Sequence, residues 1–338
     1  MRLRPYLCAA GVFALLLLTV PMLSMIKDHK KAVTPEIPQV TESPTAEKTE
    51  KTDFKTEMLK VFDTTTGQVE EISAFDYVVG AVCAQMPAAF EEEALKAQAV
   101  AAYTYAVRQR EKAETAPDKE LCGAYFSNDS RRYQAYFTEN QQKHYYGDNY
   151  EMFTDKIKKA VEAVGGEYLT YKDEPIIAAF HPLSSGKTES AKNVWGSYIP
   201  YLVSVDSKYD TSAPKYEQQF EFTSAELKRT LEKAFDGVKL DKDTPEKWFG
   251  EPKKSEAETV LTISVGGKVL TGQEIRTALS LSSAAFDVEY DDGDFIFTTK
   301  GCGHGVGMSQ FGANELAKSG KGYKEILEYY YKGVKIIS

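Results

Sequence analysis

An uncharged run near the N-terminus, residues 6–26, limits how this chain can be organised. Its 21 residues are long enough to cross the hydrocarbon core of a bilayer as one helix. No small-x-small cleavage site follows it, which favours an uncleaved anchor over a signal peptide. Basic residues on both sides leave the orientation undetermined. We therefore expect one transmembrane helix within residues 1–31, with the rest of the chain beside a cell membrane.

The stretch after the anchor, residues 32–58, is rich in Pro, Thr, Glu and Lys and nearly free of large apolar side chains. Such a composition predicts a disordered linker, because it offers no apolar surface to bury. Residues 59–338 are then expected to form the folded domain. The net charge of −9 repels phosphate backbones and argues against nucleic acid as a partner.

Local signals mark the main elements of the folded part. Ser73 stands three residues before Asp76, a capping-box spacing, and Pro87 disfavours helix at Met86, so a helix is predicted over residues 74–85. A longer helix is predicted over residues 91–112. Residues 206–300 carry their own helices and hairpins and predict a smaller inserted lobe. The expected fold is α+β, a mixed sheet with packed helices and a groove between the two lobes.

Gln85 ends the first predicted helix at the bend before Pro87. A carboxyl group at this position would lie at the negative end of the helix dipole and be partly buried, and both effects raise a carboxyl pKa. A site of this kind suits a general acid. Glutamine can donate a hydrogen bond but cannot deliver a proton. Taken alone, Gln85 can equally be a polar residue at a helix end.

His181 follows an apolar stretch and is itself followed by Ser184, Ser185 and Gly186. The pattern permits a Ser-His hydrolase, although no G-x-S-x-G elbow is present and no acid can be assigned. The alternative is a polar binding loop.

Residues 301–313 hold five glycines around Cys302 and His304. Glycine lets the backbone approach a ligand closely, so this loop can form a groove wall. Cys302 and His304 can also be half of a zinc site, completed by His181, His144 or Cys122, or Cys302 can be a nucleophile. No G-K-[ST] follows, which excludes a P-loop. Cys8, Cys83, Cys122 and Cys302 lie far apart, which leaves room for at most one disulfide, without Cys8.

Four stretches together carry a family signature: YVVGAVCAQMPAAFEEEALKAQAVAAYTYA, QAYF, FHPLSSGKTESAKNVWGSYIPYLVSVDS and GCGHGVGMSQFGANELAKSGKGYKEILEYYYKG. They resemble the stage II sporulation protein D family of peptidoglycan lytic transglycosylases, which is related to the amidase enhancers. The resemblance implies an extracytoplasmic domain between mother cell and forespore. There it would cut glycan strands that lack stem peptides during engulfment, beside stage II sporulation proteins P and M. It implies no cofactor.

Two kinds of site residue are expected, binding residues and a catalytic residue. The Gly- and Ser-rich loops around His181 and His304 are expected to line one glycan groove, where the backbone can approach sugar hydroxyls; the substrate-binding residues predicted there are His181, Ser184, Ser185, Gly303, His304, Ser309 and Gln310. The family motif reads A-E-M-P, in which the glutamate protonates the glycosidic oxygen and then deprotonates the C6 hydroxyl to close a 1,6-anhydro ring. Here Gln85 stands in that place, so about 10²- to 10⁴-fold of proton-transfer catalysis is expected to be missing.

Three explanations of Gln85 are open. The chain is a natural pseudoenzyme, or glutamine has been substituted for glutamate, or a neighbour such as Glu91 compensates. Glu91 is disfavoured because it stands at a helix N-terminus, which lowers a carboxyl pKa. Two functions are therefore carried forward: an impaired lytic transglycosylase, and a catalytically inactive glycan-binding scaffold or amidase activator.

Some members of the family hold zinc with cysteine and histidine in a loop that ends C-Q-A-Y. This chain retains Cys122 nearby but has Arg132 and Tyr133 where the other ligands would stand. One ligand does not make a site. We therefore expect no metal.

Overall fold

The computed structural model describes residues 53–338. The predicted anchor, residues 1–31, and most of the predicted linker, residues 32–58, lie outside the described residues. Within residues 53–338, none of the helices combines the length and the apolar composition needed to span a bilayer.

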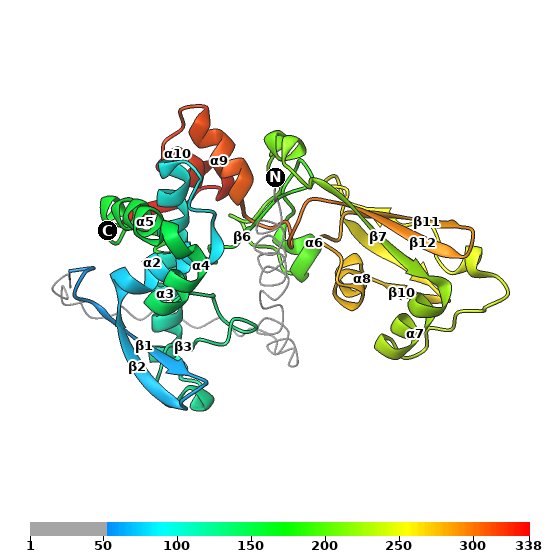
Figure 1. Ribbon diagram of the computed structural model, residues 1–338, viewed down its shortest axis with the longest axis horizontal. Helices are drawn as coiled ribbons and strands as arrows, with labels where there is room; N and C mark the ends of the chain where they lie inside the picture. The colour runs from blue at the N-terminus through cyan, green and yellow to red at the C-terminus, as the bar shows by residue number, and fades with distance from the viewer. Residues whose placement is uncertain (1–52) are drawn as a thin grey trace, which may run out of the picture.

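The larger lobe contains helices packed around α3 and two small sheets (Figure 1). Its helices are α2 (Ala74–Gln85), α3 (Glu92–Thr115), α4 (Glu139–Tyr146), α5 (Tyr150–Val164), α9 (Gln310–Lys318) and α10 (Tyr323–Tyr330). Its sheets are β2 (Gln68–Ser73), β1 (Met58–Asp63) and β3 (Phe126–Ser127), and β14 (Lys335–Ile337), β4 (Tyr168–Tyr171) and β5 (Glu174–Pro175), each in that order. Across the two lobes together, short 3-10 turns cover Lys119–Leu121, Gly147–Asn149, Lys208–Ser212 and Pro245–Lys247.

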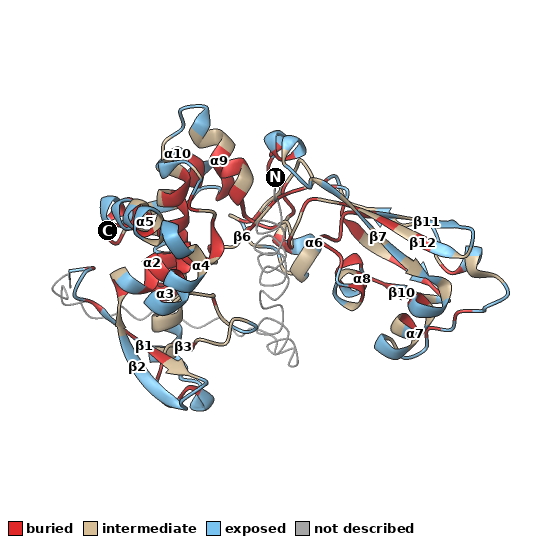
Figure 2. Ribbon diagram, in the orientation of Figure 1, coloured by how far each residue is buried: buried red, intermediate tan, exposed pale blue. Residues whose placement is uncertain are grey.

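Helix α2 has the predicted bounds. The Ser73 hydroxyl caps it by accepting a hydrogen bond from the Asp76 backbone N–H at 3.0 Å. The chain leaves the helix at Met86, which is extended with φ of −127°. Helix α3 packs against α2 and α5 through fully buried alanines, whose small side chains allow close approach. Figure 2 shows buried residues along α2 and α3.

The smaller lobe has its own hydrophobic core, formed by residues between Phe220 and Phe297, with Trp248 stacked on Phe295 at 5.1 Å between ring centroids. Its elements are β7 (Glu217–Thr223), α7 (Ser224–Ala234), β8 (Lys253–Lys254), β9 (Val260–Val265), β10 (Lys268–Leu270), α8 (Gly272–Leu279), β11 (Phe286–Asp291) and β12 (Asp294–Lys300). The hairpins turn at Gly266 and Gly293, as predicted. A separate core is what an independent lobe requires; the boundaries 206–300 stay a prediction.

Extended segments join the lobes. Strand β6 (Phe180–His181) pairs in parallel with β13 (Met308–Ser309), and α6 (Ala191–Trp195) follows the β6 loop. Single bridges connect Leu183 to Cys302 and Ser283 to Gly303. The α+β class is confirmed, but the expectation of one mixed sheet is wrong. The strands form separate sheets of two or three, because most are short and the helices interrupt them.

Candidate functional site

Gln85 lies at the last residue of α2, with 7% of its surface exposed. Its side-chain Nε2 donates a hydrogen bond to the Ala135 carbonyl, in the segment that follows β3. Its backbone carbonyl accepts a hydrogen bond from Gln310 Nε2 at 2.9 Å, and the same nitrogen lies 3.2 Å from Gln98 Oε1. Three glutamines from α2, α3 and α9 therefore meet at the bend.

The Ala135 carbonyl determines in which protonation state a carboxyl group could occupy position 85. A carbonyl oxygen has no proton, so a carboxyl group in place of the amide could make the same bond only when protonated. Burial and the negative end of the α2 dipole would also raise the pKa of a carboxyl group here. The position therefore favours a protonated carboxyl group, as a general acid requires. Glu91, by contrast, is exposed at the N-terminus of α3.

His181 and His304 are brought together beside β6 and β13, with 5.8 Å between ring centroids. His181 Nδ1 donates to the Val306 carbonyl at 3.1 Å, and the Val306 N–H donates to His304 Nδ1 at 3.0 Å. Burial lowers the pKa of His181 to about 4 and that of His304 to about 3. Both imidazoles are therefore neutral at pH 7. Trp195 lies 5.7 Å from His304, centroid to centroid.

The serines of this loop bond to partners other than histidine. The Ser184 hydroxyl donates to Asp210 Oδ2 at 2.5 Å, and the Ser185 hydroxyl donates to the Ala257 carbonyl at 2.7 Å. The one unpartnered ring nitrogen of His181, Nε2, is buried. In the described residues the contact between nucleophile and base that a Ser-His hydrolase needs is not formed.

Asp210 is a functional candidate that sequence reasoning missed. It is fully buried, and it accepts hydrogen bonds from the Ser184 backbone N–H at 2.9 Å and from the Ser184 hydroxyl. Burial raises its pKa, and hydrogen bonds from Ser184, Ser309 and Ser207 oppose that rise in part. Asp210 thereby connects the loop after β6, which contains Ser184, to Ser309 at the start of α9. No local pattern marks it, because Ser184, whose backbone and side chain both bond to its carboxylate, is 26 residues away.

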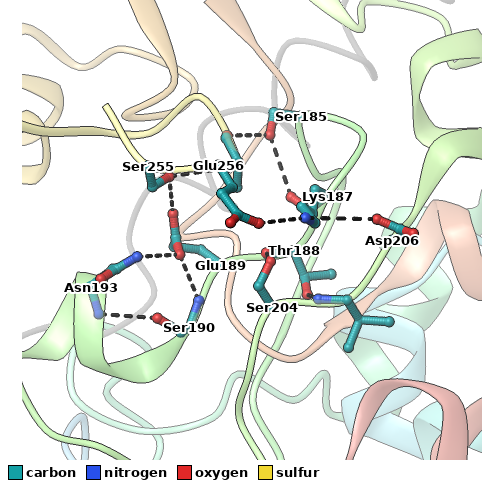
Figure 3. Close-up of polar contacts among 12 residues, drawn as sticks. Ser185, Lys187, Thr188, Glu189, Ser190, Asn193, Ser204, Asp206, Ser255 and Glu256 are labelled. Carbon is teal, nitrogen blue, oxygen red and sulfur yellow. Dashed lines mark hydrogen bonds and ion pairs between the residues drawn. The ribbon is translucent and has the colours of Figure 1, made fainter. Parts of the chain in front are cut away.

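Glu189, also missed, lies at the junction of the two lobes. Figure 3 shows its carboxylate between Ser190, Asn193 and Ser255. One oxygen accepts from the Ser190 backbone N–H at 2.7 Å and from Asn193 Nδ2 at 2.9 Å, and the other accepts from the Ser255 hydroxyl at 2.5 Å. The nearby ion pair between Lys187 and Glu256, at 2.8 Å, also crosses between the lobes. These contacts fix one lobe against the other.

The predicted binding residues fall into two adjacent groups. Ser184, Ser185, Gly303 and His304 line a small cavity at the lobe junction, together with Glu189 and Gln273. The second group, Ser309 and Gln310, lies at the start of α9. His181 connects them, because its strand pairs with Ser309 and its side chain lies against Gly303.

The cysteines show no partnership in the described part of the chain. Cys83 is buried, Cys122 is exposed and Cys302 is partly buried, and all three are free thiols. Burial raises the pKa of the Cys302 thiol, which disfavours the nucleophilic thiolate. No group of three or more His, Cys, Asp and Glu side chains in residues 53–338 is arranged to hold a metal ion.

Comparisons with known proteins place this chain. A family model described as stage II sporulation protein matches residues 62–171. Stage II sporulation protein D of Bacillus subtilis is 38% identical over 99% of this chain and 96% of the relative, and that of Bacillus amyloliquefaciens is 39% identical over 82% and 77%. The amidase enhancer of Bacillus subtilis is 27% identical over 77% of this chain and 40% of its own length. The chain therefore belongs to the stage II sporulation protein D family.

Proposed function

We propose that this protein acts on peptidoglycan glycan strands during sporulation, through a site of the lytic transglycosylase type that lacks its acid. The observation that carries the proposal is the bond from Gln85 to the Ala135 carbonyl at a buried helix end. These are the surroundings that a glutamate would need in order to stay protonated near neutral pH.

The implied reaction needs one group in two roles. Protonation of the glycosidic oxygen lets the bond to C1 break, and removal of the proton from the C6 hydroxyl lets O6 bond to C1, which closes the 1,6-anhydro ring. A carboxyl group at position 85 would give a proton in the first step and take one in the second. Gln85 can do neither, so the protein as it stands binds glycan and leaves it uncut.

The second candidate function is a catalytically inactive glycan-binding scaffold or an activator of an amidase. Similarity to a protein named amidase enhancer favours it. Gln85 fits this function without any compensating residue. Stage II sporulation proteins P and M are the partners implied by resemblance.

Restoring the acid separates the two functions. Purified protein and the variant Gln85→Glu are incubated with peptide-free glycan strands, and the products are identified by mass spectrometry. Gln142→Glu is the matched control, because Gln142 is also a buried glutamine whose Nε2 donates to a backbone carbonyl, that of Phe137 at 2.9 Å.

We expect 1,6-anhydro ends from Gln85→Glu only. Cleavage by the unmodified protein at a comparable rate would refute the loss of the acid at position 85. If neither protein cleaves but both bind, the scaffold function is favoured.

We also propose that residues 1–31 anchor the chain with its folded part outside the cytoplasm. The motivation is the uncharged run at residues 6–26 followed by the Pro- and Glu-rich linker. Protease added to intact protoplasts should release the folded part. Complete protection of that part would contradict this topology.

A further inference from the structure

Arg276, in the last turn of α8, is a partly buried cation that has no counterion among the described residues. Its Nε is buried and has no hydrogen-bond partner, and its Nη1 reaches only Gln273 Oε1, at 3.3 Å. Within residues 53–338 no carboxylate forms an ion pair with it. Removing a charge from water is costly unless a partner of opposite charge is supplied, so an unpaired guanidinium in such a place is suited to binding an anionic ligand.

The position of Arg276 connects it to the candidate site. The Leu281 N–H donates to the Arg276 carbonyl at 3.0 Å, and two residues later the Ser283 segment bridges to Gly303. The Gly303 N–H donates to the Ser282 carbonyl at 2.9 Å. The end of α8 is thus joined to the glycine-rich loop that carries His304.

The groups around this guanidinium do not neutralise it. Its positive charge adds to burial in lowering the pKa of both His181 and His304, so both rings are neutral beside it. The Cys302 thiol is also close enough to interact with the guanidinium, but burial raises the pKa of that thiol, so it supplies no compensating negative charge. Glu189 lines the same cavity as Gln273, but its oxygens accept hydrogen bonds from Ser190, Asn193 and Ser255.

A carboxylate is the anion that best fits this geometry. The planar guanidinium matches two carboxylate oxygens, and such charge-assisted pairs are stronger than neutral hydrogen bonds. In peptidoglycan, an amidase that hydrolyses the bond between the muramic acid and its stem peptide leaves a free lactyl carboxylate on the sugar. N-acetylglucosamine carries no carboxylate, and an intact stem peptide blocks the lactyl group as an amide.

We propose that Arg276 binds the lactyl carboxylate of a peptide-free N-acetylmuramic acid unit, and so makes the site selective for stripped glycan strands. The inference rests on the proposed function, because it takes the ligand to be a glycan strand. Arg276 belongs to the smaller lobe, whose Ser282–Ser283 segment contacts Gly303, and Gln85 belongs to the larger lobe. His181 of β6 lies against Gly303 on one side, and β13 continues directly into Gln310, which bonds to Gln85.

Binding measurements with three glycans of equal length test the proposal, because the unmodified protein is expected to bind without cutting. The first is a peptide-free strand, the second is the same strand with its lactyl carboxylates converted to methylamides, and the third is a chitooligosaccharide. We expect the peptide-free strand to bind about 10- to 100-fold more tightly than the other two, the range of a charged hydrogen-bonded pair.

Arg276→Gln should reduce the binding of the peptide-free strand to that of the amidated strand and leave chitooligosaccharide binding unchanged. Arg229→Gln, which removes an exposed arginine from α7 of the same lobe, should change none of the three. If Arg276→Gln does not fold, Arg276→Lys keeps the charge but loses the planar fork, and most of the preference should disappear.

The ligand comparison on unmodified protein can refute the proposal by itself, and a preference that survives Arg276→Gln in a folded variant would refute it too. Equal binding of the peptide-free and amidated strands would overturn the role of Arg276 while the proposed function stands. Absence of binding to all three glycans would overturn both.

Discussion

The substitution Gln85→Glu should make the stability of the folded part depend on pH in a defined direction. At this position a protonated carboxyl group keeps the hydrogen bond to the Ala135 carbonyl, and an ionised one faces that oxygen with no proton between them. The folded state therefore binds the proton more tightly than the unfolded chain does. Because the folded pKa is raised, stability is fully present below the unfolded value of about 4.3 and is lost as the pH rises through the folded value.

The size of the effect follows from the expected pKa. Buried catalytic glutamates are raised to about 6–7, roughly two units above the unfolded value, and each unit corresponds to about 1.4 kcal/mol. Gln85→Glu should then match the unmodified protein near pH 4 and be less stable by about 3 kcal/mol at pH 8.

Urea unfolding followed by circular dichroism at pH 4, 6 and 8 measures this difference. Gln68→Glu, at an exposed position of β2, is the control and should show no comparable change between these pH values. If Gln85→Glu loses no stability relative to the unmodified protein between pH 4 and 8, the carboxyl is not held protonated. The bend would then not be a site that holds a general acid in its protonated form.

Three further results are expected. Burial lowers the pKa of His181 from 6.5 to about 4, so acidification from pH 7 to 4 should reduce the free energy of unfolding by up to about 3 kcal/mol. In His181→Gln, urea unfolding should show a smaller loss of stability over this pH range. Burial raises the pKa of Asp210, so Asp210→Asn should gain thermal stability relative to the unmodified protein as the pH rises above about 4, and a relative loss would contradict this assignment. Gly303 has φ of +101° and an added Cβ would lie 2.9 Å from His181 Cβ, so Gly303→Val should lower the melting temperature. Gly267→Val, where φ is +84° but nothing lies within 4 Å, should lower it less, and equal losses would mean that the contact with His181 is unimportant.

Much of the local structure was predictable because its causes are local. Ser73 and Pro87 delimit α2, and glycines allow the turns at Gly266 and Gly293. Each of these signals acts on the backbone within a few residues, so it can be recognised in the sequence alone. The four family stretches likewise identified the family, which the comparisons confirmed.

The sheet arrangement could not be predicted in the same way. Strand pairing depends on which segments the helices leave adjacent, and β6 meets β13 across more than 120 residues. The expected single sheet is for this reason replaced by several small ones.

The amino-acid sequence by itself determined that position 85 ends a helix and carries an amide. Only the tertiary structure decided what surrounds that amide: the Ala135 carbonyl 50 residues away and Gln310, which is 225 residues away. It alone revealed the burial of Asp210 and showed that the Arg276 guanidinium has no carboxylate partner within residues 53–338. The physical reason is that burial and charge pairing depend on distances in space, and segments remote in the chain set those distances only after both lobes have folded.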